Sequence, residues 1–520
     1  MPSQAPVPAP TLTSHFTSTL PPSYQQQYAY EEEEYESPEQ LHSGYIEHSL
    51  NHSVVPFITS HQSGLVKHYL DHVLQRQYLL ADSSIAEFII RTVQQNPAVR
   101  DAVCLLASLH QESLRRGNPS TGQQNELVLH DEPSSDSNKA YKRICENLYT
   151  SAAGGYTEGE AMAGLFVVSA FLFRGGHGAW QHFLAVAADW VWNVLHTGAD
   201  PAETILRCSD SQQFVIKTTF WFDILASTTR LEPPRFIAVY RKLWRRSAYI
   251  IEGGASRGGS SHPQQLSSPL SMMSVMGCEN ETALAIAETS ALACWKVAQE
   301  RQGKLSVPDL VDRGRIIEQE CLSRASSASM SMHQHQQHPQ QPVPSGGVLY
   351  PAGGGGATDD LSAKRRLTAD IFRSTARVYL HSVISGEHPG CPEIRDGVRE
   401  TIECLRRVPA GGTHARSVLR SVVFGICLCG CLADDQEDRE FLLRRLDAEE
   451  QAEGVGNCAS ARLVMQEVWR RRAPCVGGGG GGGGGDNGGC GESSSSASLP
   501  PPLSWREATQ QFGGESLLLV

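Results

Sequence analysis

The chain has 520 residues, with 44 Lys plus Arg against 56 Asp plus Glu, a formal net charge of -12, 48 Gly and 28 Pro. This length gives room for one large or two ordinary domains, and the composition excludes a small disulfide-stapled domain and a collagen-like repeat. The negative balance argues against a chain that binds nucleic acid through a bulk positive field.

Residues 1–50 contain neither Lys nor Arg, and the acidic run Glu31–Glu34 lies between Tyr30 and Tyr35. Pro, Gln and Ser occupy much of the remainder, so this segment cannot bury enough apolar surface to fold alone. We predict that it forms a disordered acidic, Tyr-rich tail. Acidic residues among aromatic ones are also typical of activation segments, which is the second interpretation.

Neither export nor membrane insertion is indicated. The chain does not start with basic residues followed by an apolar stretch, so no secretory signal is predicted. The longest apolar runs, 161–173 and 422–433, fall short of the ~18 residues that a bilayer span requires. We therefore expect an intracellular protein without a membrane partner, whose cysteines are free and mostly buried thiols.

Helix signals recur along residues 51–325 and 361–472, where we place the two parts of one helical domain. Asn96 stands at a cap position before Pro97, and apolar residues then follow at helical spacing. Only Phe214–Phe222 is rich enough in β-branched and aromatic residues to pass for a strand. We predict an all-α architecture. Further stripes with helical spacing begin at Trp180, Leu284, Ser306 and Pro392.

Two low-complexity stretches interrupt and end this domain. Residues 326–360 are rich in His, Gln, Pro and Gly, and residues 473–520 are rich in Gly, Ser and Pro. Such compositions are flexible, so we predict an insertion and a disordered C-terminal tail. His333, His335 and His338 could hold a metal weakly, but in this context we interpret them as part of the compositional bias.

One acidic motif suggests an enzyme. Asp434, Asp435 and Asp438 match the DDxxD pattern with which helical terpene synthases bind magnesium beside a diphosphate. The second metal motif of such enzymes is incomplete, because Val464 stands where its Glu should be. Carboxylates ahead of the apolar residues from Phe441 onward also suit the first turn of a helix. We keep a helical magnesium-dependent enzyme as an unfavoured alternative and predict no catalytic site.

Cysteine spacing predicts no metal site. Cys427, Cys429 and Cys431 alternate in an apolar run, so only the first and the last share a helical face. We interpret them as buried thiols. No two cysteines in the chain have the C-x2-C spacing that is typical of zinc sites. The residues present therefore predict no metal and no other cofactor.

Three short basic clusters stand out. Each could form part of a nuclear import signal or a phosphate-contacting patch, and each is also typical of a solvated helix end. The clusters at 241–246 and 470–472 lie within predicted helices. Lys364, Arg365 and Arg366 lie beside the flexible insertion, so we choose them as the import candidate.

Two long strings carry a family resemblance. TTFWFDILASTTRLEPPRF at 218–236 and VMGCEN at 275–280 resemble signatures of the fungal-specific transcription factor domain found in zinc-cluster regulators. Helical strings toward both ends extend the resemblance over nearly all of the predicted ordered chain. The signature residues are Trp221, Phe222, Asp223, Arg230, Glu232, Pro233, Pro234, Gly277, Glu279 and Asn280.

The resemblance implies an all-α regulatory domain. In the family this domain lies C-terminal to a DNA-binding zinc cluster and takes part in effector response, autoinhibition or partner contacts, without catalysis. The residues themselves fit a structural role, because Trp221 and Phe222 have core size. Asp223 is placed to pair with Arg230 or Arg235.

The zinc cluster itself is not visible in the sequence. Such a cluster uses six cysteines, two C-x2-C pairs among them, to hold two zinc ions beside a basic helix. Here the first cysteine is Cys104, within the predicted helical domain. We therefore expect zinc only if a missing cluster is restored, and DNA contact only indirectly or through a missing segment.

These observations predict a nuclear transcriptional regulator that acts through protein partners. The partner would be a DNA-bound regulator or a second copy or relative in a homo- or heterodimer. A chain that lacks its DNA-binding segment and a chain that depends on a partner both stay open. The alternative is a helical protein-interaction or ligand-sensing scaffold unrelated to transcription.

Overall fold

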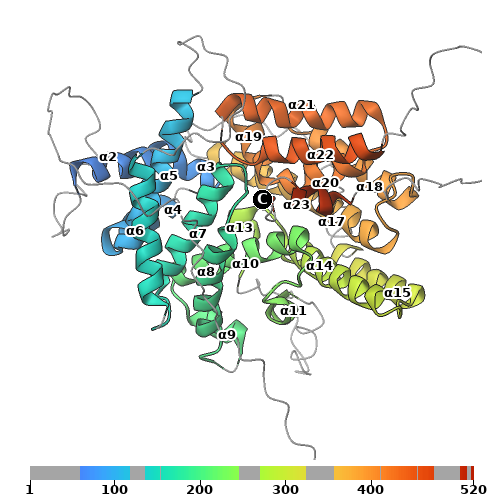
Figure 1. Cartoon of the computed structure of the whole chain (residues 1–520), viewed down its shortest axis with the longest axis horizontal. Coiled ribbons are helices and arrows are strands. Elements are labelled where there is room, and N and C mark those ends of the chain that lie inside the picture. Colours follow the sequence, from blue (N-terminus) through green and yellow to red (C-terminus); the bar gives the residue numbers. More distant parts are fainter. Residues whose placement is uncertain are drawn as a thin grey trace, which may run out of the picture. The chain divides into compact units, whose positions relative to one another are not determined.

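Helices are the only regular elements in the residues that the structure describes, which confirms the all-α prediction (Figure 1). Phe214–Phe222, which could pass for a strand, lies inside a helix. The predicted acidic tail and the candidate histidines 333–338 lie outside the described residues. The computed structural model describes residues 59–82, 84–116, 135–152, 154–198, 200–244, 270–323, 356–409, 411–453, 455–472, 504–511 and 517–520.

We divide the described helices at the stretch between residues 244 and 270, rather than at the predicted insertion 326–360, and call the two groups the first and the second part of the domain. The first part starts several of its helices at capping residues. Thr59 and Thr157 each form a capping box with the residue three positions on. Asn96 Oδ1 accepts the N–H of Val99 at 3.2 Å, and the predicted helix start at Pro97 is confirmed. The elements are α2 (Ser60–His68), the π-helical turn η2 (Tyr69–Val73), α3 (Leu74–Gln77), α4 (Ser84–Gln95), α5 (Pro97–Arg116), α6 (Ser135–Ser151), α7 (Glu158–Phe173), α8 (Trp180–Leu195), α9 (Pro201–Arg207), α10 (Asp210–Arg230) and α11 (Ile237–Trp244).

The second part follows the stretch between residues 244 and 270. Proline lies in the first turn of two of its helices, at Pro308 and Pro392, where its missing N–H costs no hydrogen bond. Its longest helix begins at Gly356, inside the predicted insertion. The elements are α13 (Met273–Met276), α14 (Asn280–Arg301), α15 (Val307–Ile317), the π-helical turn η3 (Glu318–Leu322), α17 (Gly356–Ile384), α18 (Pro392–Arg406), α19 (Gly412–Ser421), α20 (Val423–Leu432), α21 (Gln436–Glu453), α22 (Cys458–Arg472) and α23 (Trp505–Gln511).

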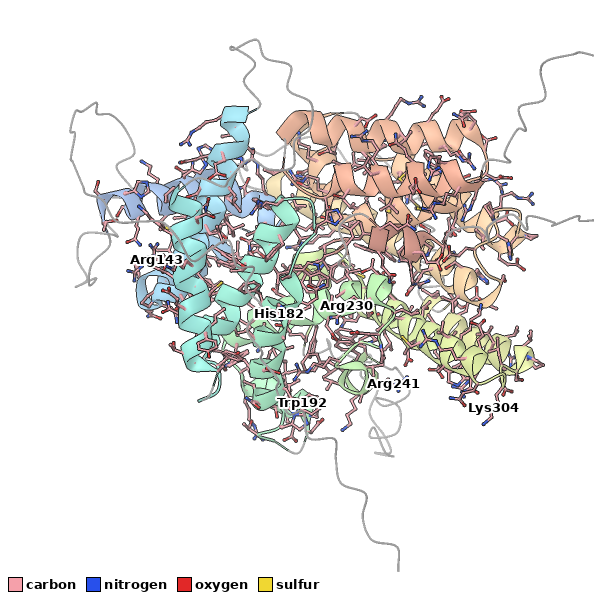
Figure 2. All side chains as sticks on the ribbon, viewed as in Figure 1. Arg143, His182, Trp192, Arg230, Arg241 and Lys304 are labelled. Atoms are coloured by element: carbon pink, nitrogen blue, oxygen red, sulfur yellow. The ribbon has the colours of Figure 1, made fainter. Side chains whose placement is uncertain are left out.

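Helix α14 joins the two parts of the domain. It packs against α10 and α11 on one side and against α15 and α17 on the other (Figure 1). In the first part α5 contacts α6 and α7, and α7 contacts α8; in the second part α17 contacts α18 and α20. Arg241 reinforces the junction through a bidentate pair with Glu288 of α14, at 2.6 Å for both bonds (Figure 2).

Helix α20 is apolar on every side and lies at the centre of the second part. All ten of its residues are buried, including Cys427, Cys429 and Cys431. Burial raises the pKa of the Cys429 thiol to about 12. Every described cysteine is a free thiol, so the prediction of free thiols is confirmed for these residues.

Among the described helices, none is long and apolar enough to cross a membrane by itself. Residues 415–421 and 423–432 reach the required length and composition only together, and the chain bends by 65° between them.

The structure corrects the prediction for part of the C-terminal tail, residues 473–520. Helix α23 and residues 517–520 belong to the packed core. Trp505 is fully buried, and its ring centre lies 6.4 Å from those of Tyr379 and Phe424. Composition alone predicted a tail here, because the surface that buries Trp505 is supplied by α17 and α20, far away in the sequence.

Candidate functional site

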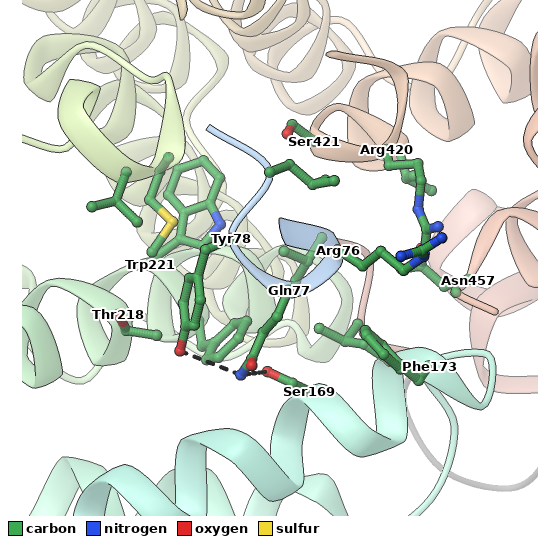
Figure 3. A pocket seen from close by; sticks show the side chains of 18 of the residues that line it. Arg76, Gln77, Tyr78, Ser169, Phe173, Thr218, Trp221, Arg420, Ser421 and Asn457 are labelled. Carbon is green, nitrogen blue, oxygen red and sulfur yellow. Dashed lines mark hydrogen bonds between the residues drawn. The ribbon is translucent and has the colours of Figure 1, made fainter. Parts of the chain in front are cut away.

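A cavity of about 100 Å³ lies where the two parts of the domain meet (Figure 3). We call it the central cavity. Its walls come from the end of α3, from α7, α10 and α13, from the junction of α19 and α20, from the loop before α22 and from Val520. The polar and aromatic side chains that line it include those of Arg76, Gln77, Tyr78, Ser169, Thr218, Trp221, Arg420 and Asn457.

A short hydrogen-bond network closes one side of the central cavity. Gln77 Nε2 donates to Ser169 Oγ at 3.0 Å and to Tyr78 Oη at 3.3 Å, as the dashed lines in Figure 3 show. Gln77 Oε1 accepts the hydroxyl of Tyr69 at 2.6 Å. Burial raises the pKa of both tyrosines, so both hydroxyls stay neutral. The sequence did not point to this network, because Gln77 and Ser169 are 92 residues apart.

Helix α10 supplies the aromatic wall of the central cavity. Trp221 and Phe222 are both buried, and the Trp221 ring meets Phe372 of α17 edge-on at 5.2 Å. One turn earlier, Thr218 Oγ1 is buried and has no hydrogen-bond partner among the described residues. The first family signature thus builds both the core and the wall of the cavity.

Two arginines face the same space. Arg76 and Arg420 both line the central cavity (Figure 3), and Arg420 Nη2 donates to the carbonyl of Val455 at 2.9 Å. Beside them, Asn457 Nδ2 donates to the carbonyl of Leu518 at 2.9 Å. The C-terminal residues are therefore hydrogen-bonded into this wall.

The lining of the central cavity contains two arginines and few other ionisable side chains. Among the described residues that line it, none is Asp, Glu, His or Lys. General acid–base catalysis needs a group whose pKa lies near the working pH, whereas arginine stays protonated. A space of about 100 Å³ holds roughly three water molecules.

Asp223 organises the turn that follows α10. Its carboxylate accepts the backbone N–H groups of Arg235 at 3.0 Å and Phe236 at 3.2 Å, and the hydroxyl of Tyr240 at 2.7 Å. Burial raises the pKa of Asp223, and these hydrogen bonds oppose that shift. Asp223 therefore meets the backbone of Arg235, while the Arg235 guanidinium pairs with Asp189 at 2.7 Å.

The rest of the first signature forms the end of α10. Arg230 pairs with Glu232 at 2.7 Å, so neither predicted guanidinium pairs with Asp223. Leu231, between them, has φ 54° in the left-handed region, and it is the one described non-glycine residue with positive φ. Pro233 and Pro234 then prevent the helix from continuing.

The second signature fastens α14 to its neighbours. Gly277 has φ +64°, and a Cβ there would lie 2.4 Å from Leu80 Cδ1. Glu279 Oε1 accepts Arg373 Nη2 at 2.9 Å. The Asn280 side chain bonds the backbone of residues 270 and 272. These contacts give the second signature a structural role.

The DDxxD motif forms the start of a helix. Asp435 lies just ahead of α21, and its Oδ1 accepts the backbone N–H groups of Glu437 at 2.7 Å and Asp438 at 3.4 Å. Both N–H groups belong to the first turn of the helix, so Asp435 caps it. Asp434 is exposed, and Asp438 lies 3.9 Å from Arg406. The described residues contain no group of three or more His, Cys, Asp or Glu that could hold a metal ion.

The import candidate is less accessible than its place in the sequence suggests. Lys364 pairs with Asp360 at 2.6 Å, and its side chain is 15% exposed. Arg365 is 18% exposed and donates to the carbonyl of Leu80 at 2.9 Å. Of the three basic residues, only Arg366 is exposed.

The described helices form an all-helical domain in which residues of both signature strings help to line the central cavity. Comparison with known families identifies the family. The chain matches the fungal specific transcription factor domain over residues 64–519, and it belongs to that family. No solved structure matches the chain.

Relatives of the chain are named transcription regulators rather than enzymes. The trichothecene biosynthesis transcription regulator TRI10 of Trichoderma arundinaceum is 27% identical over 39% of this chain and 40% of its own length. The ustiloxin B cluster transcription factor ustR of Aspergillus flavus is 23% identical over 48% of this chain and 36% of its own length. The transcription factor dibT of Pestalotiopsis microspora is 30% identical over 39% of this chain and 31% of its own length. The chain thus spans well under half the length of these relatives.

Proposed function

We propose that this chain is the regulatory part of a fungal transcription regulator of the zinc-cluster type, working in the nucleus through protein partners. The observation that carries the proposal is the family match over residues 64–519. The geometry supports it, since the signature residues serve helix packing and the wall of a cavity without an acid–base pair. DNA contact would come from a partner or from a segment outside this sequence.

We propose further that its targets are genes of a biosynthetic cluster. The names of two relatives point to this class of target, since one is a regulator of trichothecene biosynthesis and the other a factor of the ustiloxin B cluster. The product made by the cluster that this chain controls would be specific to its own host.

The test is to delete the gene and sequence the messenger RNA. We expect the transcripts of a contiguous set of biosynthetic genes to fall or rise together, and the reintroduced gene to restore them. As a matched control, the host is complemented with a chain carrying Gly277→Ala, which puts a Cβ against Leu80 and disturbs the fold. An unchanged transcriptome in the deletion strain would refute the proposal.

Nuclear import through residues 364–366 is a separate proposal. Arg365 holds α17 against the carbonyl of Leu80, so changing it would confuse import with folding. We therefore change Lys364→Ala and Arg366→Ala together in a fluorescently tagged full chain and leave Arg365 intact. We expect the fluorescence to leave the nucleus, whereas Arg399→Ala, in an exposed pair on α18, should change nothing. Nuclear fluorescence of the double variant would refute the import role.

A further inference from the structure

A second cavity, of about 350 Å³, lies where the ends of α10, α14, α17 and α22 meet the start of α23. We call it the C-terminal cavity. Its volume falls within the range of small-molecule sites, which the central cavity does not reach. Leu231, Val297 and Val383 give it an apolar wall, and Lys296, Arg472 and Arg506 bring positive charge to it.

The three cations approach the C-terminal cavity from three different helices. Lys296 Nζ on α14 donates to the carbonyl of Val383 at 2.8 Å, its one acceptor among the described residues. Arg472 ends α22 and donates to the carbonyls of Cys431 and, at 3.4 Å, of Glu387; its pKa is lowered chiefly by burial. Arg506 on α23 donates from Nε to the carbonyl of Thr228 at 2.8 Å and from Nη2 to the hydroxyl of Tyr379 at 2.9 Å. Ammonium and guanidinium groups have several donors each, so donors remain for a ligand.

Two carboxylates also line this cavity, and neither balances the cations fully. The oxygens of Glu387 accept Ser504 Oγ at 2.8 Å and the Trp505 N–H at 2.9 Å, which places this carboxylate at the start of α23. Its nearest cation in the cavity is Arg506, 3.7 Å away. Glu300 is exposed at the end of α14. Three cationic side chains against two acidic ones leave a positive balance.

The apolar wall contains the strained residue of the family signature. Leu231 has φ 54°, a conformation that is strained for an ordinary side chain and is often found at binding sites. Its neighbours Arg230 and Glu232 pair with each other, and the prolines that follow fix the turn. A leucine thus stands at the wall of this cavity at a position where glycine would be unstrained.

We propose that the C-terminal cavity binds a small organic carboxylate with a short apolar body. The carboxylate would lie against Lys296 and Arg472, whose donors suit an anionic oxygen pair, and the apolar body against Leu231, Val297 and Val383. This inference goes beyond the proposed function, because it concerns a binding site and not transcription.

Binding there is coupled to the seating of the C-terminal helix. Ser504 and Arg506 belong to α23 and its cap and also line the cavity, so the site is complete only while α23 is docked. A ligand that binds only the docked form stabilises that form by mass action. The bound carboxylate therefore holds α23 in place.

The experiment titrates the full chain by calorimetry with succinate and benzoate, and with succinamide as a neutral match. We expect both carboxylates to bind and succinamide to give no heat. Lys296→Met should raise Kd about tenfold or more, because it removes a charge-assisted hydrogen bond. Lys304→Met removes an exposed lysine just beyond α14 (Figure 2) and should leave Kd unchanged.

A second measurement needs no variant. Hydrogen exchange of the α23 amides, 505–511, should slow in succinate and not in succinamide. The proposal is overturned if none of the carboxylates binds at millimolar concentration, if succinamide binds equally, or if inorganic phosphate binds while the carboxylates do not. Equal loss of affinity in Lys296→Met and Lys304→Met would also overturn it.

Discussion

The two cavities of the helical domain differ in how their walls use polar groups. In the central cavity, the Gln77 amide donates to Ser169 and Tyr78 and accepts from Tyr69. This network links α3 to α7. In the C-terminal cavity, Lys296 bonds one backbone carbonyl, Arg472 bonds two, and the cations face a larger space. The polar groups of the central cavity therefore mainly hold helices together, whereas those of the C-terminal cavity are placed to bind a ligand.

The C-terminal residues border both cavities, so they connect the two. Val520 lines the central cavity, and Ser504 with Arg506 lines the C-terminal cavity. A change that loosens either end of this segment should affect one cavity first. Substitutions at the two ends of this segment can therefore distinguish effects on the central cavity from effects on the C-terminal cavity.

The largest effect is expected from Trp505→Ala. This side chain is fully buried between Tyr379 and Phe424, so its loss should destabilise the docked α23 by about 3–5 kcal/mol. The measurement is urea unfolding together with hydrogen exchange of residues 505–511. We expect the exchange rates there to rise even where the main transition moves little, since short terminal helices open locally at lower free energy than the whole domain.

Trp192→Ala is the matched control, since that tryptophan is 41% exposed on α8. It should cost much less, because less apolar surface returns to water. Equal losses for Trp505→Ala and Trp192→Ala would show that α23 does not hold the core as described.

Gly176→Ala should disturb the central cavity next. A Cβ at this residue would lie 2.5 Å from the carbonyl oxygen of Leu518, and φ is +81°. We expect a loss of about 1–3 kcal/mol in the free energy of unfolding. Gly303→Ala separates the two causes, since φ there is +64° but nothing lies within 4 Å. If both variants lose the same amount, the contact with Leu518 contributes nothing.

Much of the fold was predictable because its signals are local. The start of α5 follows from Asn96 and Pro97 alone, and α20 from an unbroken apolar run. The helix α23 was missed because it is only seven residues long and follows a Gly-, Ser- and Pro-rich stretch, although Ser504 and Glu507 have the spacing of a capping box. Its stability depends on Tyr379 and Phe424, which chain topology brings to Trp505.

The sites were less predictable than the fold. The strings that carry the family resemblance correctly indicate Trp221 and Phe222 as buried residues, and α10 places both at the central cavity. They gave no reason to single out Leu231, because a left-handed conformation at leucine has no sequence signal. Lys296 and Arg472 come together only through the packing of α14, α17 and α22.

Leu231 allows a smaller and sharper test at the C-terminal cavity. Leu231→Gly removes the left-handed strain but also some apolar contact, so we expect stability to change by less than about 1 kcal/mol. Leu231→Val keeps an apolar side chain but adds β-branching, and should lose about 1–2 kcal/mol. Thermal and urea unfolding measure both. A stable Leu231→Val protein would mean that the turn adapts and that no strain is held there.

The smallest effect concerns the arginines that end α22, where only Arg472 lines a cavity. Arg470 and Arg471 both pair with Glu467 at the surface, at 2.7 and 2.6 Å. The Arg470 hydrogen bond is the main reason why the pKa of Glu467 falls from 4.5 to about 2. Because the folded-state pKa is the lower one, the stabilisation is present above pH 4.5 and disappears as the pH falls toward 2.

Glu467→Gln should therefore lower the urea midpoint slightly near neutral pH, and the difference from the unchanged chain should shrink on acidification. Water and salt screen this surface pair, so the loss should be smaller than for Leu231→Val and should fade at high ionic strength. Succinate binding should not change, because Arg472 takes no part in the Glu467 pairs. Weaker binding in Glu467→Gln would mean that the three arginines act as one cluster, and the contrast between surface and cavity charge would fail.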